Sequence, residues 1–380
     1  MEMQTQETDI LVVGAGIIGL AHAYIAAKAG YKVVVVEKDM QSTGASVRNF
    51  GLIWPIGQAP GTALTMALKS REIWQSLSVE AGFWLNRNGS MLLACSEEEM
   101  NVLAEFYENA YSYGYNCKID SAQKVKEKLG NYVPNHIKGA LSSTTEMKVN
   151  PLEAVAAIAK LLTEKYNVQI VYGKAVSRIE MPYVLAGRYM WKAKKVFMCS
   201  GDEFSILYPE TFAKQNMLKC KLQMMKVKAD NNVSENLPTI SGGLTLMHYA
   251  SFRHCMSLEE LSNRLHQESS EAIKQGIHVL LSASLDGEFI VGDSHIYGNS
   301  VDPFIDEQIN TEILVQLEKV YHLQNPQITK RWIGVYAKHS DGLFFRDEVE
   351  DGVHIISGLG GNGMTLSFGL AEENIRDLLK

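Results

Sequence analysis

The sequence has few cysteines, and they are scattered along the chain. There are five, an odd number, with no Cys-x-x-Cys pair and no cysteine and histidine spacing typical of a metal site. We interpret them as reduced, buried thiols and expect neither a disulfide framework nor a bound metal. They are Cys95, Cys117, Cys199, Cys220 and Cys255.

Long basic segments are also missing, and we expect no leader segment. The formal net charge is −7 and lysine and arginine form no long cluster, which argues against nucleic acid or an anionic membrane as a partner. Residues 1–8 are polar and acidic, and the apolar run that follows them is too short to cross a bilayer. We therefore expect a cytoplasmic protein without a membrane span that binds a small molecule. Its oligomeric state stays open.

The length and the hydrophobic content of the chain indicate two domains. A chain of 380 residues is long for one hydrophobic core, and 46% hydrophobic residues are enough to fill two. We find no internal repeat, low-complexity tract or linker that would divide the chain, so its function has to be inferred from its motifs.

The first motif lies near the N-terminus and has the order strand, glycine turn, helix, strand. An apolar run at 9–13 leads into Gly-Ala-Gly-Ile-Ile-Gly at 14–19 and then into an alanine-rich amphipathic stretch. A second apolar run at 32–36, typical of a buried parallel strand, ends in Glu37. A lone glycine motif is often a chance turn, but here both strands, the helix and the acidic residue agree. The pattern predicts dinucleotide binding.

Each residue of this motif meets a physical demand. Gly14 permits the tight turn, Gly16 lets the backbone approach a pyrophosphate, and Gly19 lets the helix pack closely on the strand. The free N–H groups and the positive end of the helix dipole hold the phosphates. Glu37 is placed to accept hydrogen bonds from the adenosine ribose.

The loop at 41–55 is rich in small residues and contains one arginine, Arg48. A plain surface connection is one interpretation of this loop. The other is a cofactor or substrate role for Arg48 and Asn49, because ligand-binding loops gather at the carboxyl ends of parallel strands.

The second half of the chain predicts another sheet and another glycine motif. Strand patterns cover 219–227, 239–252, 276–284 and 289–297, with polar residues at the far end of this sheet.

Near the C-terminus an apolar strand enters Gly-Leu-Gly-Gly-Asn-Gly-Met-Thr at 358–365, which opens a helix. A plain helix cap would explain these glycines. However, glycine-rich helix starts at both ends of the chain suit FAD, because the closing helix would direct its positive end at the flavin and favour reduction.

With these motifs the sequence resembles the FAD-dependent oxidoreductase family that contains D-amino acid oxidase, glycine oxidase and monomeric sarcosine oxidase. The resemblance covers essentially the whole chain and rests on both glycine motifs, Glu37, the loop at 44–51 and the Cys-Ser-Gly turn at 199–201. The chain looks most like an uncharacterised bacterial branch, some members of which are associated with phosphonate utilisation. The similarity to that branch lies at residues 45–51, 221–225 and 292–295.

The resemblance implies an α/β fold, α+β overall, with two domains. A discontinuous, Rossmann-like FAD-binding domain would comprise residues 1–80, 145–215 and 325–380. Residues 81–144 and 216–324 would form a substrate domain, whose mainly antiparallel β-sheet covers the flavin.

The resemblance also implies which residues contact FAD. Val176 would meet the adenine through its backbone, Gly201 would lie close to the cofactor, and Arg48 and Asn49 would border the isoalloxazine ring. The expected set is Gly14, Gly16, Ile17, Ile18, Gly19, Glu37, Lys38, Ser46, Arg48, Asn49, Val176, Ser200, Gly201, Gly358, Gly360, Gly361, Asn362, Gly363, Met364 and Thr365.

The substrate would lie between the flavin ring and the second sheet. The surrounding side chains would be those of His248, Tyr249, Arg253, His295, Tyr297 and Tyr336. An acidic substrate needs a fixed cation, and the planar fork of arginine binds a carboxylate or a phosphonate at two points. The residues that we expect to bind the anion or orient the amine are Arg48, Arg253, His295, Tyr297 and Tyr336, with Arg331 as a further candidate. A structural ion pair or hydrogen bond is the alternative role for each.

Two departures from the sarcosine-oxidase branch change what we expect. That branch attaches FAD through a cysteine, whereas this chain has Gly334 in the corresponding stretch and no cysteine after Cys255, so FAD should be non-covalent. The branch also places a lysine over flavin N5 to assist the reaction with oxygen. The approximate match here is Ile290, which puts rapid use of oxygen in question.

Amine oxidation is the reaction that the resemblance implies. A hydride leaves the carbon next to nitrogen for flavin N5 and the resulting imine hydrolyses, so an obligatory side-chain base is not required. The substrate would be a small primary or secondary amine, an amino acid or an aminoalkylphosphonate, with oxygen as the final acceptor. The alternatives are a flavin dehydrogenase of a 2-hydroxy acid or amine that uses another electron carrier, a non-catalytic flavin-binding component of an assembly, and an NAD enzyme.

Overall fold

The computed structural model of the protein describes residues 5–231 and 234–378. Within them, β1 (Thr5–Val13) lies inside an eight-stranded sheet and is apolar on both faces. Ile10 and Val12 pack against helices, whereas Leu11 and Val13 belong to a separate core on the opposite face. Both faces of the second half of the strand are therefore buried, as expected for a parallel strand between two layers.

Parallel pairing dominates the centre of this sheet. β1 pairs in parallel with β2 (Val33–Val36) and β12 (Tyr189–Met198), and β12 pairs in parallel with β20 (Val353–Ser357). The carboxyl ends of these four strands therefore meet at one edge of the sheet. The remaining strands are β9 (Gln169–Val171), β10 (Arg178–Glu180), β11 (Tyr183–Ala186) and β19 (Phe345–Glu350).

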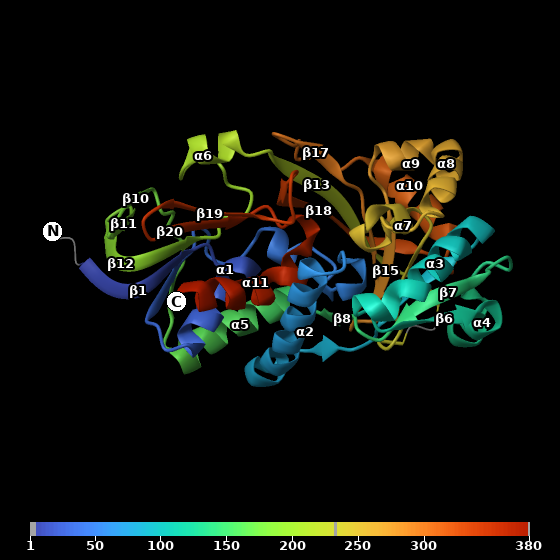
Figure 1. Ribbon diagram of the computed structural model, residues 1–380, viewed down its shortest axis with the longest axis horizontal. Coiled ribbons are helices and arrows are strands. Elements are labelled where there is room, and N and C mark those ends of the chain that lie inside the picture. The colour runs from blue at the N-terminus through green and yellow to red at the C-terminus, as the bar shows by residue number, and fades with distance from the viewer. Residues whose placement is uncertain (1–4, 232–233, 379–380) are drawn as a thin grey trace.

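Four helices pack together on one side of this sheet (Figure 1). Local sequence explains where they begin. At the start of α5 (Pro151–Tyr166) the Asn150 side chain accepts a hydrogen bond from the Leu152 N–H group. Pro151 occupies the first turn, where its missing N–H group costs nothing. The helices are α1 (Ile17–Lys28), α2 (Thr62–Ala81), α5 (Pro151–Tyr166) and α11 (Gly363–Leu378).

A second, nine-stranded sheet is antiparallel except where β14 pairs with β5. Its longest pair joins β13 (Met217–Lys228) and β18 (Gln327–His339). The other strands are β5 (Ser90–Ala94), β6 (Cys117–Ser121), β7 (Gly139–Ser143), β14 (Thr239–Gly242), β15 (Val279–Ala283), β16 (Phe289–Gly292) and β17 (Ile296–Gly298).

The helices of this second region lie at the far end of the molecule from both termini (Figure 1). They are α3 (Glu97–Tyr113), α4 (Ala122–Leu129), α7 (Leu244–His248), α8 (Leu258–Glu268), α9 (Ser270–Lys274) and α10 (Glu307–Glu318). A small sheet of β3 (Leu52–Ile53), β4 (Leu85–Asn86) and β8 (Met147–Val149) lies apart from both large sheets, and α6 (Pro209–Lys214) precedes β13. No helix in the described part of the chain is long and apolar enough to cross a membrane.

The structure confirms the expected fold class, with a parallel and an antiparallel sheet, but corrects two predicted strands. The expected strand 239–252 ends at Gly242, and the chain continues as α7 and a short 3-10 helix. The expected strand 289–297 is divided into β16 and β17 by residues 293–295. The division into an FAD-binding and a substrate domain stays a prediction. β18, which we assigned to the first of these domains, pairs within the nine-stranded sheet.

Lys148, on β8, is an amine buried without an ion-pair partner among the described residues. Only 2% of the residue is exposed, and its Nζ donates a hydrogen bond to the Ala283 carbonyl at 2.6 Å. Burial lowers the pKa of Lys148 to about 8, because the charged form loses its hydration. The folded state therefore holds this proton less tightly than the unfolded chain does.

We expect Lys148→Met to raise the melting temperature of the FAD-loaded protein at pH 7. The folded-state pKa of about 8 lies below the unfolded value of roughly 10.4. Burial of the charged amine therefore lowers the free energy of unfolding by its full amount below pH 8, and this destabilisation disappears between pH 8 and roughly 10.4. Its size is on the order of 3 kcal/mol. Thermal unfolding between pH 7 and 10 should show the variant's advantage shrinking as the pH rises. Exposed Lys124→Met is the control, and a constant difference between Lys148→Met and wild type would contradict the prediction.

Candidate active site

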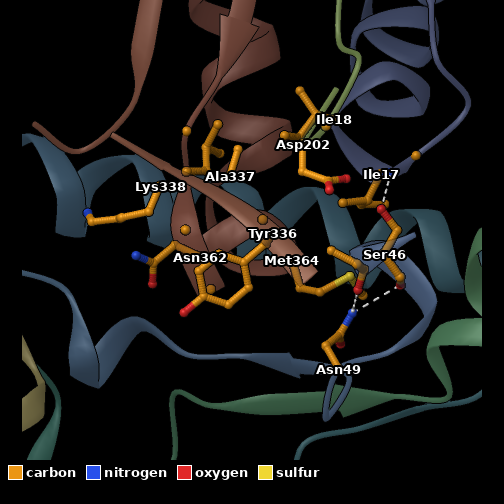
Figure 2. Close-up of a pocket in the computed structure, with 18 of the residues that line it drawn as sticks. Ile17, Ile18, Ser46, Asn49, Asp202, Tyr336, Ala337, Lys338, Asn362 and Met364 are labelled. Carbon is orange, nitrogen blue, oxygen red and sulfur yellow. Dashed lines mark hydrogen bonds between the residues drawn. The ribbon is translucent and has the colours of Figure 1, made fainter. Parts of the chain in front are cut away.

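A cavity of about 1220 Å³ is lined by residues from both large sheets. Part of its wall consists of the loops that follow β1, β2, β12 and β20, whose carboxyl ends meet at one edge. β13, β15, β17, β18 and α7 contribute further parts of the wall, together with the residues that follow α7 and residues from the segments 174–176 and 293–295. Figure 2 shows Ile17, Ser46 and Asn49 on one side of this space and Tyr336 and Asn362 on the other.

The opening glycines allow two close backbone approaches. Gly14 has a φ of +101°, and a Cβ atom there would lie 2.5 Å from the Cys199 carbonyl oxygen. A Cβ atom on Gly19 would lie 2.0 Å from the Gly14 carbonyl oxygen, so this residue allows α1 to pack on the turn and does not line the cavity. Gly16 does line the cavity.

The N-terminus of α1 has unpaired backbone N–H groups that can bind an anion. Gly16 is the N-cap residue and has no side chain with which to cap the helix. The Ile17 N–H group donates to Ser46 Oγ at 2.8 Å (Figure 2), whereas the N–H groups of Gly16 and Ile18 have no partner among the described residues. Unpaired N–H groups and the positive end of the helix dipole together favour a phosphate group.

Glu37 holds the glycine turn to the loop that follows β2. The side chain is buried, and its Oε2 accepts a hydrogen bond from the Ala15 N–H group at 2.7 Å while Oε1 accepts one from Asp39 N–H at 3.0 Å. Each carboxylate oxygen can accept a further bond, so a hydroxyl group in the cavity can still be bound. The neighbouring Lys38 also lines the cavity.

Val176 presents an unused peptide edge at the cavity wall. The residue is buried, and its N–H and C=O groups have no hydrogen-bond partner within residues 5–231 and 234–378. Buried backbone groups without a partner are rare in folded proteins. A planar ligand with both donor and acceptor groups, such as adenine, would satisfy them.

The loop that contains Arg48 and Asn49 is shaped by its own side chains. Asn49 Nδ2 donates to the carbonyl oxygens of Ala45 and Ser46 (Figure 2), and its Oδ1 accepts from the Gly51 N–H group at 2.7 Å. The amide of Asn49 therefore maintains the loop conformation. Arg48 is exposed at the cavity, where its Nη1 lies 3.4 Å from the Ile333 carbonyl.

Gly334 brings this loop close to β18. A Cβ atom there would lie 3.1 Å from the Arg48 carbonyl oxygen and 2.8 Å from Leu222 Cδ1. A cysteine therefore does not fit at this position without displacing a neighbour, which agrees with the expected non-covalent cofactor.

The closing glycine motif is hydrogen-bonded to the segment that follows β3. Gly358 and Gly360 have φ values of +75° and +61°, which turn the chain from β20 into α11. Asn362 Oδ1 accepts from Gln58 Nε2 at 2.9 Å, and Thr365 Oγ1 accepts from the Trp54 N–H group at 3.0 Å. The N-terminal end of α11 thereby lines the same cavity as the N-terminal end of α1.

Cations line the cavity on its substrate side. Arg253 and Lys338 both line it, and neither forms an ion pair with a described residue. Burial, followed by the charge of Arg253, lowers the pKa of Lys338. Arg331 instead pairs with Glu307 at 3.1 Å, outside the cavity lining, and Ile290 also lies outside it.

Three histidines and an aspartate form a cluster in the cavity wall. His248 and His278 stack with ring centroids 3.8 Å apart, and His295 lies 4.7 Å from the first and 5.0 Å from the second. Asp293 Oδ1 lies 3.3 Å from His278 Nε2. Burial holds the pKa values of His248 and His278 well below the usual range and raises that of Asp293 to about 6. The imidazoles of His248 and His278 are therefore neutral at pH 7.

The cavity brings together the expected cofactor set except Gly19, together with the expected substrate residues Arg48, Arg253, His295, Tyr297 and Tyr336. His248 and Tyr249 also line it, but from α7 and the residue after it, not from a strand. His278, Asp293 and Lys338 were missed. No local signal identifies His278 or Lys338, whereas Asp293 could have been included through its neighbour His295. The individual roles of these residues remain predictions.

Comparison with known proteins identifies the family. A family model described as FAD dependent oxidoreductase matches residues 9–374. The chain belongs to this family. FAD, the cofactor of this family, fits three features of the structure. They are the unpaired N–H groups of the α1 N-terminus, the free peptide edge of Val176 and the continuous cavity.

A curated relative and two solved structures add detail to this assignment. D-amino acid dehydrogenase of Helicobacter pylori is 25% identical over 224 residues, which is 45% of this chain and 53% of the relative. The chain thus spans about half the length of the curated relatives it matches first. L-proline dehydrogenase from P. horikoshii has a TM-score of 0.78 at 22% identity, covering 97% of this chain and 92% of that one. Glycine oxidase from Geobacillus kaustophilus has a TM-score of 0.79 at 18% identity, covering 99% and 95%. These two structures share the fold.

We expect Gly14→Ala to weaken FAD binding by at least about tenfold. The added methyl group would meet the Cys199 carbonyl at 2.5 Å, and alanine at a φ of +101° costs roughly 1–3 kcal/mol in addition. Fluorescence titration of the apoprotein with FAD measures the affinity. Gly44→Ala, in the same cavity wall, is the control because its methyl group would meet nothing within 4 Å. Equal affinity in the two variants would refute this role for Gly14.

Proposed function

We propose that the protein is an FAD-dependent oxidase of a small primary or secondary amine that carries an anionic group, an amino acid or an aminoalkylphosphonate. The observation that carries this proposal is the presence of unpaired cations in a cavity that continues to the glycine motifs. Arg48, Arg253 and Lys338 line it and form no ion pair within the described residues. The names of the relatives, which act on D-amino acids, proline or glycine, support the same substrate class.

In this proposal the chain's own residues bind and orient the substrate. Arg253 and Lys338 hold its anionic group, and the buried Tyr336, on the same face of β18 as Lys338, restricts its position. Bound FAD supplies the acceptor for a hydride from the carbon next to nitrogen. The neutral imidazoles of His248 and His278 add no positive charge beside the amine. His295 and Tyr297 complete the wall around it.

A dehydrogenase that passes electrons to another carrier is the second candidate. Two of the relatives described above are named dehydrogenases, which favours it. In addition, Ile290, our approximate match for the lysine that assists oxygen use in the sarcosine-oxidase branch, is apolar and lies outside the cavity.

Anaerobic bleaching of the flavin absorbance tests the proposal. One class of amine should bleach the flavin absorbance of the purified protein. The classes to test are glycine, sarcosine, other D- and L-amino acids, and aminoalkylphosphonates. Rapid recovery in air with formation of hydrogen peroxide identifies an oxidase, and slow recovery identifies a dehydrogenase. If no amine bleaches a flavin that is plainly bound, amine oxidation is refuted, and 2-hydroxy acids become the next candidates.

We expect Arg253→Met and Lys338→Met each to raise the KM for the anionic amine by roughly 10- to 100-fold, with a smaller effect on kcat. A hydrogen bond to a charged group contributes about 1.5–3 kcal/mol, which corresponds to that range. Steady-state kinetics measures both constants. The control is Arg331→Met, because Arg331 forms an ion pair with Glu307 outside the cavity. Unchanged KM values in both cavity variants would show that the anion is held elsewhere.

A further inference from the structure

His248, His278 and His295 come together where α7, the start of β15 and the segment after β16 meet. Each offers one ring nitrogen, and the three nitrogens lie within 4.8 Å of one another. All three side chains line the cavity, although none belongs to the glycine motifs. Binding an anionic amine requires cations and hydrogen-bond donors, so three imidazole rings gathered in one place call for a further explanation.

The surroundings of two of these rings leave a nitrogen lone pair available. His295 Nδ1 donates to the Gly276 carbonyl at 3.0 Å, so the neutral ring has its lone pair on Nε2. His278 Nε2 lies 3.3 Å from Asp293 Oδ1 without forming a hydrogen bond, and His278 Nδ1 is buried and has no partner among the described residues. A backbone carbonyl that accepts from the imidazole, as Gly276 does from His295, is an arrangement that supports metal-ligating histidines.

We propose that His248, His278 and His295 bind a divalent transition-metal ion of the zinc class, with Asp293 as the neighbouring carboxylate. Imidazole nitrogen is a preferred ligand of Zn²⁺, and three protein ligands with a fourth position open to a cavity form a stable site. The fourth position faces the space in which the proposed substrate binds. The site goes beyond the proposed amine oxidation, which needs no metal.

Binding requires a small rearrangement of the rings. Tetrahedral zinc with Zn–N distances of roughly 2.0–2.1 Å places its nitrogens about 3.4 Å apart, which is closer than the 4.8 Å limit of the cluster. His248 has no hydrogen-bond partner within the described chain, so its ring can turn away from the stacked His278 and toward the ion.

The charges near the cluster favour a metal ion that is bound by the three imidazoles and one anion. Asp293 supplies a negative charge beside two of the rings, 3.3 Å from His278 and 3.8 Å from His295. The positive charges of Arg253 and Lys338 also act on His248 and oppose a cation. An anion in the fourth position, such as hydroxide, would offset that repulsion.

Zinc titration of the FAD-loaded protein tests this site. After removal of metal with EDTA and buffer exchange, the protein is titrated with zinc sulfate in competition with a coloured chelator. We expect one equivalent to bind. His248→Asn and His278→Asn should each weaken the affinity by at least about 100-fold, and Asp293→Asn, which removes the neighbouring carboxylate, by roughly 10- to 100-fold. Flavin absorbance and melting temperature show whether each variant is folded, and His278→Gln replaces any asparagine variant that is not.

His266→Asn is the matched control, because His266 is exposed on α8 and bonds within its own helix. Its affinity for zinc should equal that of the wild type. The proposal is overturned if the wild type binds no stoichiometric zinc, or if folded variants of His248 and His278 bind it as tightly as the control does. No amine is present in this titration, so its outcome is independent of the outcome for amine oxidation.

Discussion

The parallel alignment of β2, β1, β12 and β20 is the constraint on which the site depends. Because these strands run in the same direction, the glycine turn, Glu37, the Cys199–Gly201 turn and the closing motif all emerge at one edge. Two of these loops approach closely, since a Cβ atom on Gly14 would lie 2.5 Å from the Cys199 carbonyl oxygen. A side chain on Gly14 would push the glycine turn after β1 away from the Cys199–Gly201 turn after β12.

β18 links the two halves of the cavity. Paired along its length with β13, it belongs to the antiparallel sheet, yet its end contacts the closing glycine motif. A Cβ atom on Gly358 would lie 2.8 Å from His339 Cβ, and one on Gly360 would lie 3.0 Å from Lys338 Cδ. Tyr336 and Lys338 therefore reach the cavity from a strand that also positions the N-terminus of α11. A displacement of β18 would change the cofactor wall and the substrate wall together.

The cofactor half of the site could be predicted because its determinants are local. Glycine spacing, apolar strands and the terminal Glu37 are adjacent in the chain, so their geometry follows from short-range rules. The histidine cluster depends instead on strand register, since His278 and Asp293 face each other only because their backbone N–H and C=O groups pair across two strands. The predicted strand at 239–252 contains His248. The chain turns at Gly242 and Gly243, where a Cβ atom on Gly242 would meet the Leu93 carbonyl at 2.6 Å.

The unpaired cations of the cavity have a second consequence for amine oxidation as proposed. A hydride leaves a neutral amine far more readily than an ammonium group, because the nitrogen lone pair stabilises the positive charge that develops on carbon. Nearby positive charges and burial both disfavour a further cation, so they lower the pKa of an amine bound beside them. Burial and Arg253 lower the pKa of Lys338 in this way. The field that holds the anionic group of the substrate therefore also favours the reactive, neutral form of its nitrogen.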